Sequence, residues 1–336
     1  MVTADGQALG FAERPDAAPQ PSTRTAFLIL NPRAGSRHGA IHRVVAVAAE
    51  LGWSLRVVET TARGDATRLA AEAVQRRDRF VLIGGGDGTM NEVIQALAGT
   101  QTAVGAIPFG TMNVWVRELG ISLDPADATR QLLLGQVRRI DLGRVNDRHF
   151  LLMAGIGFDA EAVHSLGDAP KGRFRALTFF LTGALAAIRT RGQRVRIRLD
   201  HESIETNAAL VTVGNTRLWA GAVQITHRAT AADGLLDVCV FPARSLFTKL
   251  RYLALVLIGR HDTDPDVWYR QVRELHVVSR PPVPLQVDGE PFGMTPAHVM
   301  VVPGALQALV GNGQAPALDG AEIVHRNLTE DDLGPR

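Results

Sequence analysis

The sequence predicts an α/β plus β fold, with an N-terminal domain built on a parallel sheet and a second, mainly antiparallel β domain. Up to about residue 140, buried apolar runs alternate with helical stretches, which is typical of a parallel sheet covered on both faces. After about Asp141, short strand-like runs follow one another between turn residues, which favours antiparallel pairing. With 336 residues, 46% of them hydrophobic and 21% charged, the chain is long enough for two cores.

The first domain is expected over residues 25–140, completed by a returning segment at about 305–320. Apolar runs and helical periodicity set its elements. Strands are predicted within 26–30, 54–61, 79–86 and 103–110, and helices over 41–51, 65–76 and 91–97. The crossovers between successive parallel strands should be right-handed.

The second domain is expected over residues 141–304. Its predicted strands are the runs RIDLGRV, HFLLMAGIGF, RVRIRLD, NAALVTVGN, LLDVCVF, ELHVVS and PLQVDGE. Two helices should interrupt them, at Arg173–Arg191 and Leu246–Gly259, and the run HVMVVPGALQALV should return to the first domain as a closing strand. Residues 1–24 are expected to be a disordered tail and residues 321–336 a second tail.

Composition and charge exclude several classes of protein. The net charge of +2 gives no reason to expect a nucleic-acid partner. The lone Cys239 rules out a disulfide within the chain and fits a reducing compartment. The longest uncharged stretch, 176–188, is too short to span a bilayer. We therefore expect a cytoplasmic protein that can lie at the inner membrane face, because its two helical insertions are apolar with basic residues and such segments adsorb to anionic lipid. A homodimer is left open.

The sharpest motif is the run GGGDGTMNE, which follows a predicted strand and precedes a predicted helix. Ligands of parallel sheets bind at this position, where glycines let the backbone approach a phosphate and helix-start amides face the anion. A magnesium ion would resolve the repulsion between Asp87 and phosphate; the alternative is that Asp87 only caps a helix. The motif is neither a Walker loop nor a complete G-x-G-x-x-G fingerprint. Its candidate nucleotide-binding residues are Gly84, Gly85, Gly86, Asp87, Gly88, Thr89, Asn91 and Glu92.

Five segments in order resemble the diacylglycerol kinase catalytic-domain family, which includes sphingosine kinases and bacterial lipid kinases. In chain order they are NPRAGS, GGGDGT followed by Asn91-Glu92, PFGTMN, DGLLDV and VDGE. The likeness spans about Phe27 to Val310. The resemblance implies an enzyme that transfers the terminal phosphate of ATP, with Mg²⁺, to a hydroxyl of a lipid substrate such as a diacylglycerol or a sphingoid base. It adds nucleotide-side candidates at Asn31, Gly35, Ser36, Gly110, Thr111 and Asn113.

The resemblance also implies roles for the acidic residues. Glu290 is expected to accept the proton of the lipid hydroxyl, since such a weak nucleophile needs a base. Asp87 is the competing candidate for this role. The predicted metal ligands are Asp87, Asp233, Asp237 and Asp288, because hard cations prefer carboxylate oxygens. For Asp233 the alternative is a hairpin turn at Asp233-Gly234.

The sequence departs from the family at Val114, where many members carry an Asp that joins a network of metal and water. An apolar side chain cannot hold a metal-bound water, which puts the identity of the substrate in doubt more than ATP binding. Asp159, in a further segment similar to the family, either faces the substrate or caps a turn. The alternatives are an NAD kinase, which shares the GGDGT turn, a lipid-binding relative that has lost catalysis, and an ATP-regulated domain that binds a partner.

Overall fold

The computed structural model describes residues 24–34, 39–157, 192–199, 202–219, 223–313, 315–325 and 328. Several predictions lie outside these residues: the first tail apart from Arg24, the predicted site residues Gly35 and Ser36, Asp159, the helix at 173–191 and most of the second tail.

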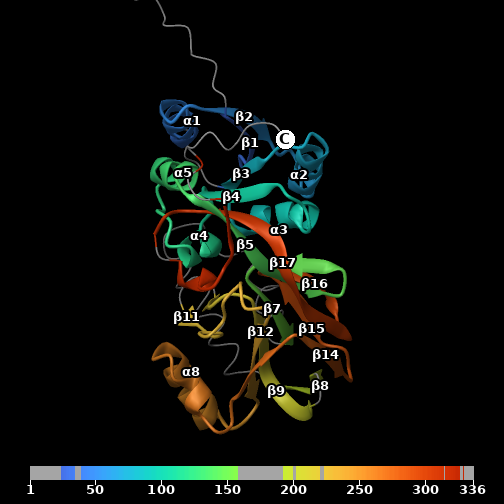
Figure 1. Ribbon diagram of the computed structural model, residues 1–336. Helices are drawn as coiled ribbons and strands as arrows, with labels where there is room; N and C mark the ends of the chain where they lie inside the picture. Colours follow the sequence, from blue (N-terminus) through green and yellow to red (C-terminus); the bar gives the residue numbers. More distant parts are fainter. Residues whose placement is uncertain are drawn as a thin grey trace, which may run out of the picture.

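Four parallel strands form the N-terminal sheet, in the order β2-β1-β3-β4 (Figure 1). They are β1 (Arg24–Leu30), β2 (Trp53–Glu59), β3 (Phe80–Gly85) and β4 (Ala103–Pro108). The helices between them are α1 (Ala40–Glu50), α2 (Asp65–Gln75) and α3 (Asp87–Leu97). Every residue of β3 and β4 is buried, which explains why these strands are continuous apolar runs without alternation.

Two short helices that the sequence reading did not identify lie between β4 and the second domain. They are α4 (Val114–Glu118) and α5 (Pro125–Leu133). The α5 helix carries its own start signals, because the Asp124 carboxylate accepts hydrogen bonds from the amides of Ala126 and Asp127 and Pro125 occupies the first turn. The α4 helix has no such local signal, because the side chain of its N-cap residue, Asn113, makes no capping hydrogen bond.

The second domain is mainly antiparallel. Its longer strands are β5 (Gln136–Val145), β8 (Gln193–Leu199), β9 (Glu202–Gly214), β12 (Leu236–Pro242) and β14 (Glu274–Ser279). The shorter ones are β6 (Arg148–Phe150), β7 (Met153–Gly157), β10 (Leu218–Trp219), β11 (Val223–Gln224), β13 (Trp268–Val272), β15 (Pro284–Val287) and β16 (Glu290–Met294). The helix α8 (Leu246–Leu257) and the one-turn helix η1 (His261–Thr263) follow β12.

One long strand belongs to both halves of the molecule. The first part of β17 (Ala297–Val310) pairs antiparallel with β14, and its last part pairs parallel with β4 at Gln307 and Ala308. It also runs antiparallel to β5 along almost its whole length. The two halves therefore share one continuous sheet, and the β domain is held close to the carboxyl ends of the parallel strands (Figure 1).

The predicted α/β plus β class is confirmed, and two boundaries were wrong. The α3 helix begins at Asp87 rather than at Asn91, so the run GGGDGTMNE is helix from Asp87 onward. The second tail, expected over residues 321–336, begins too early, because the one-turn helix η2 (Pro316–Leu318) is followed by β18 (Ile323–His325), which pairs with β5. Among the described residues, no helix is long and apolar enough to cross a membrane.

Candidate active site

A groove of about 580 Å³ runs along the carboxyl ends of all four parallel strands. Each strand contributes the residues that follow it, and the β domain contributes Glu290 at the start of β16. This edge is where ligands of parallel sheets bind. The lining residues are Asn31, Arg33, Ala34, Thr60, Thr61, Ala62, Arg63, Ala66, Gly86, Gly88, Thr89, Glu92, Gly110, Thr111 and Glu290.

The glycines of the motif are required because two loops touch there without side chains. A Cβ on Gly86 would lie 3.2 Å from the Cα of Gly110, and one on Gly110 would lie 2.5 Å from the Cα of Gly86. A Cβ on Gly85 would lie 2.7 Å from the side chain of Thr89. The loops after β3 and β4 therefore form one continuous floor for the groove, and the start of α3 opens onto it.

The loop after β1 is fixed to this floor. The amide of Asn31 donates to the carbonyl of Gly84 at 2.8 Å, and Asn31 Nδ2 donates to Thr89 Oγ1 at 3.0 Å. Asn31 and Thr89, both predicted nucleotide-binding residues, thus lie together in the groove. Thr111 also lines it, whereas Asn113 turns back, with Nδ2 donating to the carbonyl of Gly110 at 2.8 Å.

The sequence reading missed the loop after β2, which supplies Thr60, Thr61, Ala62 and Arg63 to the groove. Asp65, the first residue of α2, holds this loop: its Oδ2 accepts hydrogen bonds from the amides of Thr61 and Ala62 and from the Thr61 hydroxyl. These bonds lower the pKa of Asp65 to about 2. The sequence does carry a signal for this loop, because Asp65 begins a predicted helix that follows a predicted strand of the parallel sheet.

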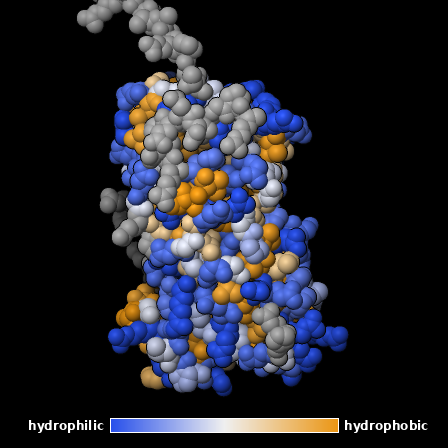
Figure 2. Space-filling model, viewed as in Figure 1, coloured by the Kyte–Doolittle hydropathy of each residue, from blue (hydrophilic) through white to orange (hydrophobic). Residues whose placement is uncertain are grey.

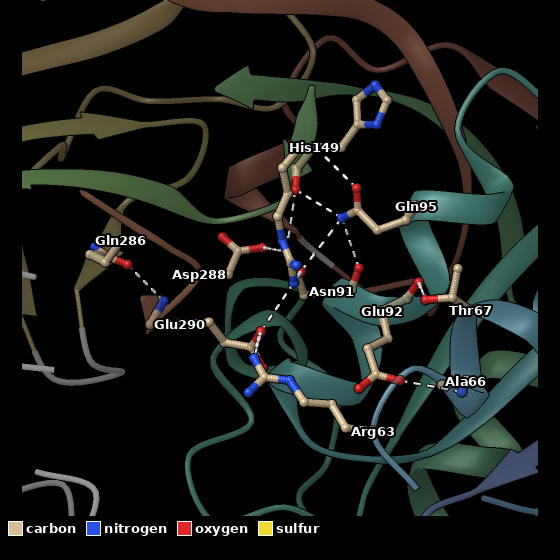
Figure 3. A network of polar contacts seen from close by, with 12 residues as sticks. Arg63, Ala66, Thr67, Asn91, Glu92, Gln95, His149, Gln286, Asp288 and Glu290 are labelled. Carbon is tan, nitrogen blue, oxygen red and sulfur yellow. Dashed lines mark hydrogen bonds and ion pairs between the residues drawn. The ribbon is translucent and has the colours of Figure 1, made fainter. Parts of the chain in front are cut away.

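Glu290 lies over the start of α3 and is held by two arginines (Figure 3). Arg63 Nη2 and Arg148 Nη2 lie 2.8 Å and 3.0 Å from the same oxygen, Glu290 Oε2. The other oxygen, Oε1, faces Gly88, where an added Cβ would lie 3.4 Å from it. Arg63 is 74% exposed and Arg148 only 27%, so the two contacts differ in their freedom to move.

Asp288 is a structural centre of the interface between the two halves. Its Oδ1 accepts hydrogen bonds from the amides of Leu152 and Met153, and its Oδ2 accepts them from the amide of Leu151 and from Asn91 Nδ2, all at 2.8–3.0 Å. Burial raises the pKa of Asp288, and the hydrogen bonds lower it. Four N–H donors leave no acceptor for a carboxyl proton, so we take the group as ionised.

The same aspartate forms the tight turn between β15 and β16. Asp288 and Gly289 have φ angles of 49° and 81°, the left-handed values that a two-residue hairpin turn with Asp-Gly requires. Gln286 Oε1 accepts a hydrogen bond from the amide of Gly289 at 2.7 Å. The turn places Glu290 at the groove. The VDGE motif therefore supplies both Asp288, which shapes the turn, and Glu290, which lines the groove.

Asn91 links α3 to the β domain. It is 1% exposed and donates a hydrogen bond to Asp288 (Figure 3). Its Oδ1 accepts a hydrogen bond from Arg148. Glu92 lines the groove, and its Oε2 accepts a hydrogen bond from the amide of Ala66 at 3.3 Å. The pair Asn91-Glu92 therefore faces two ways, with Asn91 toward the second domain and Glu92 toward the loop after β2.

Asp87 does not line the groove; its carboxylate points to the start of α4. Oδ1 accepts a hydrogen bond from the amide of Trp115 at 3.1 Å, and the amide of Val114 also bonds the carboxylate. Burial raises the pKa of Asp87, and these amides lower it. Asp87 thus supplies the cap that α4 lacks locally. The side chain of Val114, where the family commonly has Asp, is 6% exposed and part of the core.

The other acidic motif, DGLLDV, lies on β12 and the turn before it. Asp237 Oδ1 accepts a hydrogen bond from the Tyr269 hydroxyl at 2.6 Å, and Gln271 Nε2 lies between Asp237 and Asp233 at 3.3 and 3.5 Å. Burial raises the pKa of Asp237 to about 6, and that of Asp233 is raised by burial and by the nearby Asp141 carboxylate. Within the described ranges, no three His, Cys, Asp or Glu side chains are arranged as a metal cluster.

Both halves of the chain match families of known proteins. Residues 25–145 match the diacylglycerol kinase catalytic domain, and residues 153–310 match the YegS C-terminal, NAD kinase β-sandwich-like domain. A diacylglycerol kinase of Mycobacterium tuberculosis (strain CDC 1551 / Oshkosh) is 32% identical over 301 residues, which cover 84% of this chain and 93% of the relative. This chain belongs to the diacylglycerol kinase family.

Two further comparisons agree with this assignment. A diacylglycerol kinase of Bacillus subtilis (strain 168) is 28% identical, with 88% of this chain and 99% of the relative covered. The crystal structure of a diacylglycerol kinase from Bacillus anthracis strain Sterne superposes with a TM-score of 0.72 at 26% identity, covering 86% of this chain and 98% of that one. The predicted class of enzyme, an ATP-dependent lipid kinase that phosphorylates an alcohol group, is thereby confirmed.

Proposed function

We propose that the chain transfers the γ-phosphate of MgATP to the free hydroxyl of a diacylglycerol. The observation that carries this proposal is the position of Glu290, which comes from the β domain and closes a groove formed by the ends of the four parallel strands. A phosphate donor in the groove and an acceptor that approaches along the β domain would meet there. The names of the relatives favour diacylglycerol over a sphingoid base as the acceptor.

The nucleotide phosphates would lie on the floor made by Gly86, Gly88 and Gly110. Amides at the start of α3 are without helical partners and favour an anion there. Arg33 and Arg63 line the same groove and add positive charge. Since phosphoryl transfer depends mainly on positioning and on neutralising charge, these groups would supply most of the catalytic effect of the protein.

Glu290 would act as the base. Both arginines bond Oε2, so Oε1 is the oxygen directed at the groove floor. As the lipid oxygen forms its bond to the γ-phosphorus, the bond from that phosphorus to the β,γ-bridging oxygen breaks, and the hydroxyl proton passes to Oε1. Asp87, the competing candidate, is engaged by the amides of α4 and does not line the groove.

We place the metal of the β domain at Asp233 and Asp237. The pKa of Asp237 is raised by burial and by Asp233, and that of Asp233 by burial and by Asp141, so three carboxylates lie close together and a divalent cation would neutralise them. When bound there, Mg²⁺ would supply charge neutralisation and order the segment. Asp288 does not fit this role, because four hydrogen bonds already occupy its oxygens. Asp87 fits it poorly because amides at the start of α4 bond its carboxylate and it does not line the groove, so MgATP would bring its own ion.

The test is transfer of labelled phosphate from ATP to dispersed diacylglycerol, sphingosine and NAD, for the unchanged chain and for Glu290→Gln. We expect labelled diacylglycerol, and a kcat that is lower by on the order of a hundredfold or more in Glu290→Gln with ATP binding retained. Full turnover in Glu290→Gln would remove this residue from the base role. Labelled NAD would favour the NAD kinase alternative, and bound ATP without any product would favour an inactive lipid-binding relative.

A further inference from the structure

The α8 helix presents its apolar side to solvent. Phe247 is 77% exposed and Ile258, just beyond the helix end, is 65% exposed. Tyr252, on the opposite side, is the one helix residue that is buried. The exposed apolar residues recur at helical spacing and form a stripe along one side of α8, made of Leu246, Phe247, Leu250, Leu257 and Ile258. Figure 2 shows hydrophobic surface at the lower left of the molecule, where Figure 1 places α8.

A stripe of this kind is unusual for a surface helix, which normally turns its apolar side to the core. Contiguous exposed apolar residues mark an interaction surface. The stripe lies at the end of the β domain that is farthest from α1 and α2 (Figure 1). It is therefore separate from the nucleotide groove and is not explained by it.

The charges around the stripe identify the partner. From Val238 to His261 the chain carries Arg244, Lys249, Arg251 and Arg260 and no acidic residue. Of the acidic residues that follow, Asp262 and Asp264 have side chains only 9% and 3% exposed and pair with Arg228 and Arg251. Asp266 is 35% exposed and pairs with Arg244 and Arg251. The base of α8 therefore carries more basic than acidic side chains.

A second group of basic residues lies beside the base of α8. On the outward face of β8, Arg194 and Arg196 share a single acidic partner, Glu205, at 2.7 and 3.0 Å. Arg194 pairs across the strands with Asn207, whose carbonyl accepts a hydrogen bond from the amide of Ala243, three residues before α8. An apolar stripe bordered by cations is the pattern of a helix that lies in the headgroup region of an anionic bilayer.

We propose that the α8 stripe inserts into the surface of an anionic membrane and so holds the β domain on the bilayer that contains the lipid substrate. This inference rests on the proposed function for its purpose but not for its test. Apolar burial supplies binding energy through Phe247 and its neighbours, and the arginines and Lys249 add attraction that depends on anionic lipid and weakens with salt.

The experiment is sedimentation of the full chain with vesicles of phosphatidylcholine alone or mixed in equal parts with phosphatidylglycerol, without ATP. We expect binding to the mixed vesicles only, weakened by about tenfold in Phe247→Ser, since a buried aromatic side chain is worth that much. The matched control is Leu134→Ser, an exposed apolar residue of the first domain, which should bind like the unchanged chain. Transfer of phosphate to diacylglycerol in detergent should be equal in all three proteins.

A probe shows whether the stripe itself enters the membrane. Cys239 is buried, so an environment-sensitive dye will react selectively with Phe247→Cys. Quenching of the dye by brominated lipid in the mixed vesicles supports the proposal. A dye that is already shielded before vesicles are added would overturn it. Gel filtration would then show whether the stripe is covered by a second copy of the chain or by another part of the same copy. Equal binding of Phe247→Ser and the unchanged chain would overturn it as well.

Discussion

The two acidic motifs of the β domain look alike in sequence and differ in their charge balance. In DGLLDV, Asp237 is buried and Asp233 is exposed, the two carboxylates share Gln271 as a donor, and the pKa values of both are raised. In VDGE, Asp288 accepts four hydrogen bonds and Glu290 is paired with two arginines. The carboxylates of the first motif are bonded by neutral donors, whereas Glu290 of the second is paired with two arginines.

This difference indicates which motif needs a cation. A carboxylate pair without enough donors is stabilised by a metal, whereas a carboxylate that is already satisfied gains nothing from one. The second motif uses its charges within the protein: Asp288 fixes the turn and the interface, and its neighbour Glu290 is thereby set over the groove. Two motifs that the sequence suggests as equivalent metal sites therefore have different proposed functions.

The largest effect that would test this contrast is on stability. In Asp288→Asn, either orientation of the new amide places its NH₂ group against two N–H donors, so about 3 kcal/mol should be lost from the free energy of unfolding, measured with urea. Asp233→Asn is the matched control. It removes a crowded charge without orphaning donors, and should leave the metal-free protein as stable as before or more stable. Equal losses in the two variants would contradict the proposed difference.

A smaller effect is expected at the two arginines that hold Glu290. Arg148→Met removes the half-buried contact and leaves Asn91 Oδ1 with only the 3.5 Å hydrogen bond from Gln95 Nε2, so kcat should fall by on the order of tenfold while the KM for ATP stays unchanged. Arg148→Lys should restore part of the rate. Arg63→Met, which removes the exposed arginine of the groove, should instead raise the KM for ATP. Steady-state kinetics at saturating lipid separate the two, and identical profiles would contradict the different roles.

The most gradual effect concerns pH. Because the pKa of Asp237 is raised from 3.8 to about 6, the fold favours the protonated form, and this group's contribution to stability is lost as the pH rises from about 4 to about 6 without metal. Mg²⁺ needs the ionised form, so its affinity should fall about tenfold per pH unit below about 6. Thermal unfolding with and without MgCl₂ between about pH 4 and about pH 8 measures this. In Asp237→Asn, Mg²⁺ should no longer stabilise the protein at any pH.

Much of the groove was predictable because it depends on local signals. Strands that end in Asn31, Gly84–Gly86 and Pro108–Gly110 are adjacent in a parallel sheet, and their carboxyl ends share one edge. The loop at Thr60–Arg63 follows the same rule and was missed only because it carries no known motif. The exposure of Phe247 was not predictable, since the apolar pattern of Leu246–Gly259 is equally typical of a helix packed on a core.

The sequence by itself determined the class of fold, the order of the elements and the lipid kinase family, since these depend on periodicity and on motifs whose residues are near one another in the chain. Only the tertiary structure decided what the acidic residues do. Asp87 caps α4 at Trp115, Asp288 binds the amides of Leu151–Met153, and Glu290 meets Arg63 from the other half of the molecule. The role of a carboxylate is set by the donors around it, and here the deciding donors come from distant parts of the chain that the shared sheet brings together.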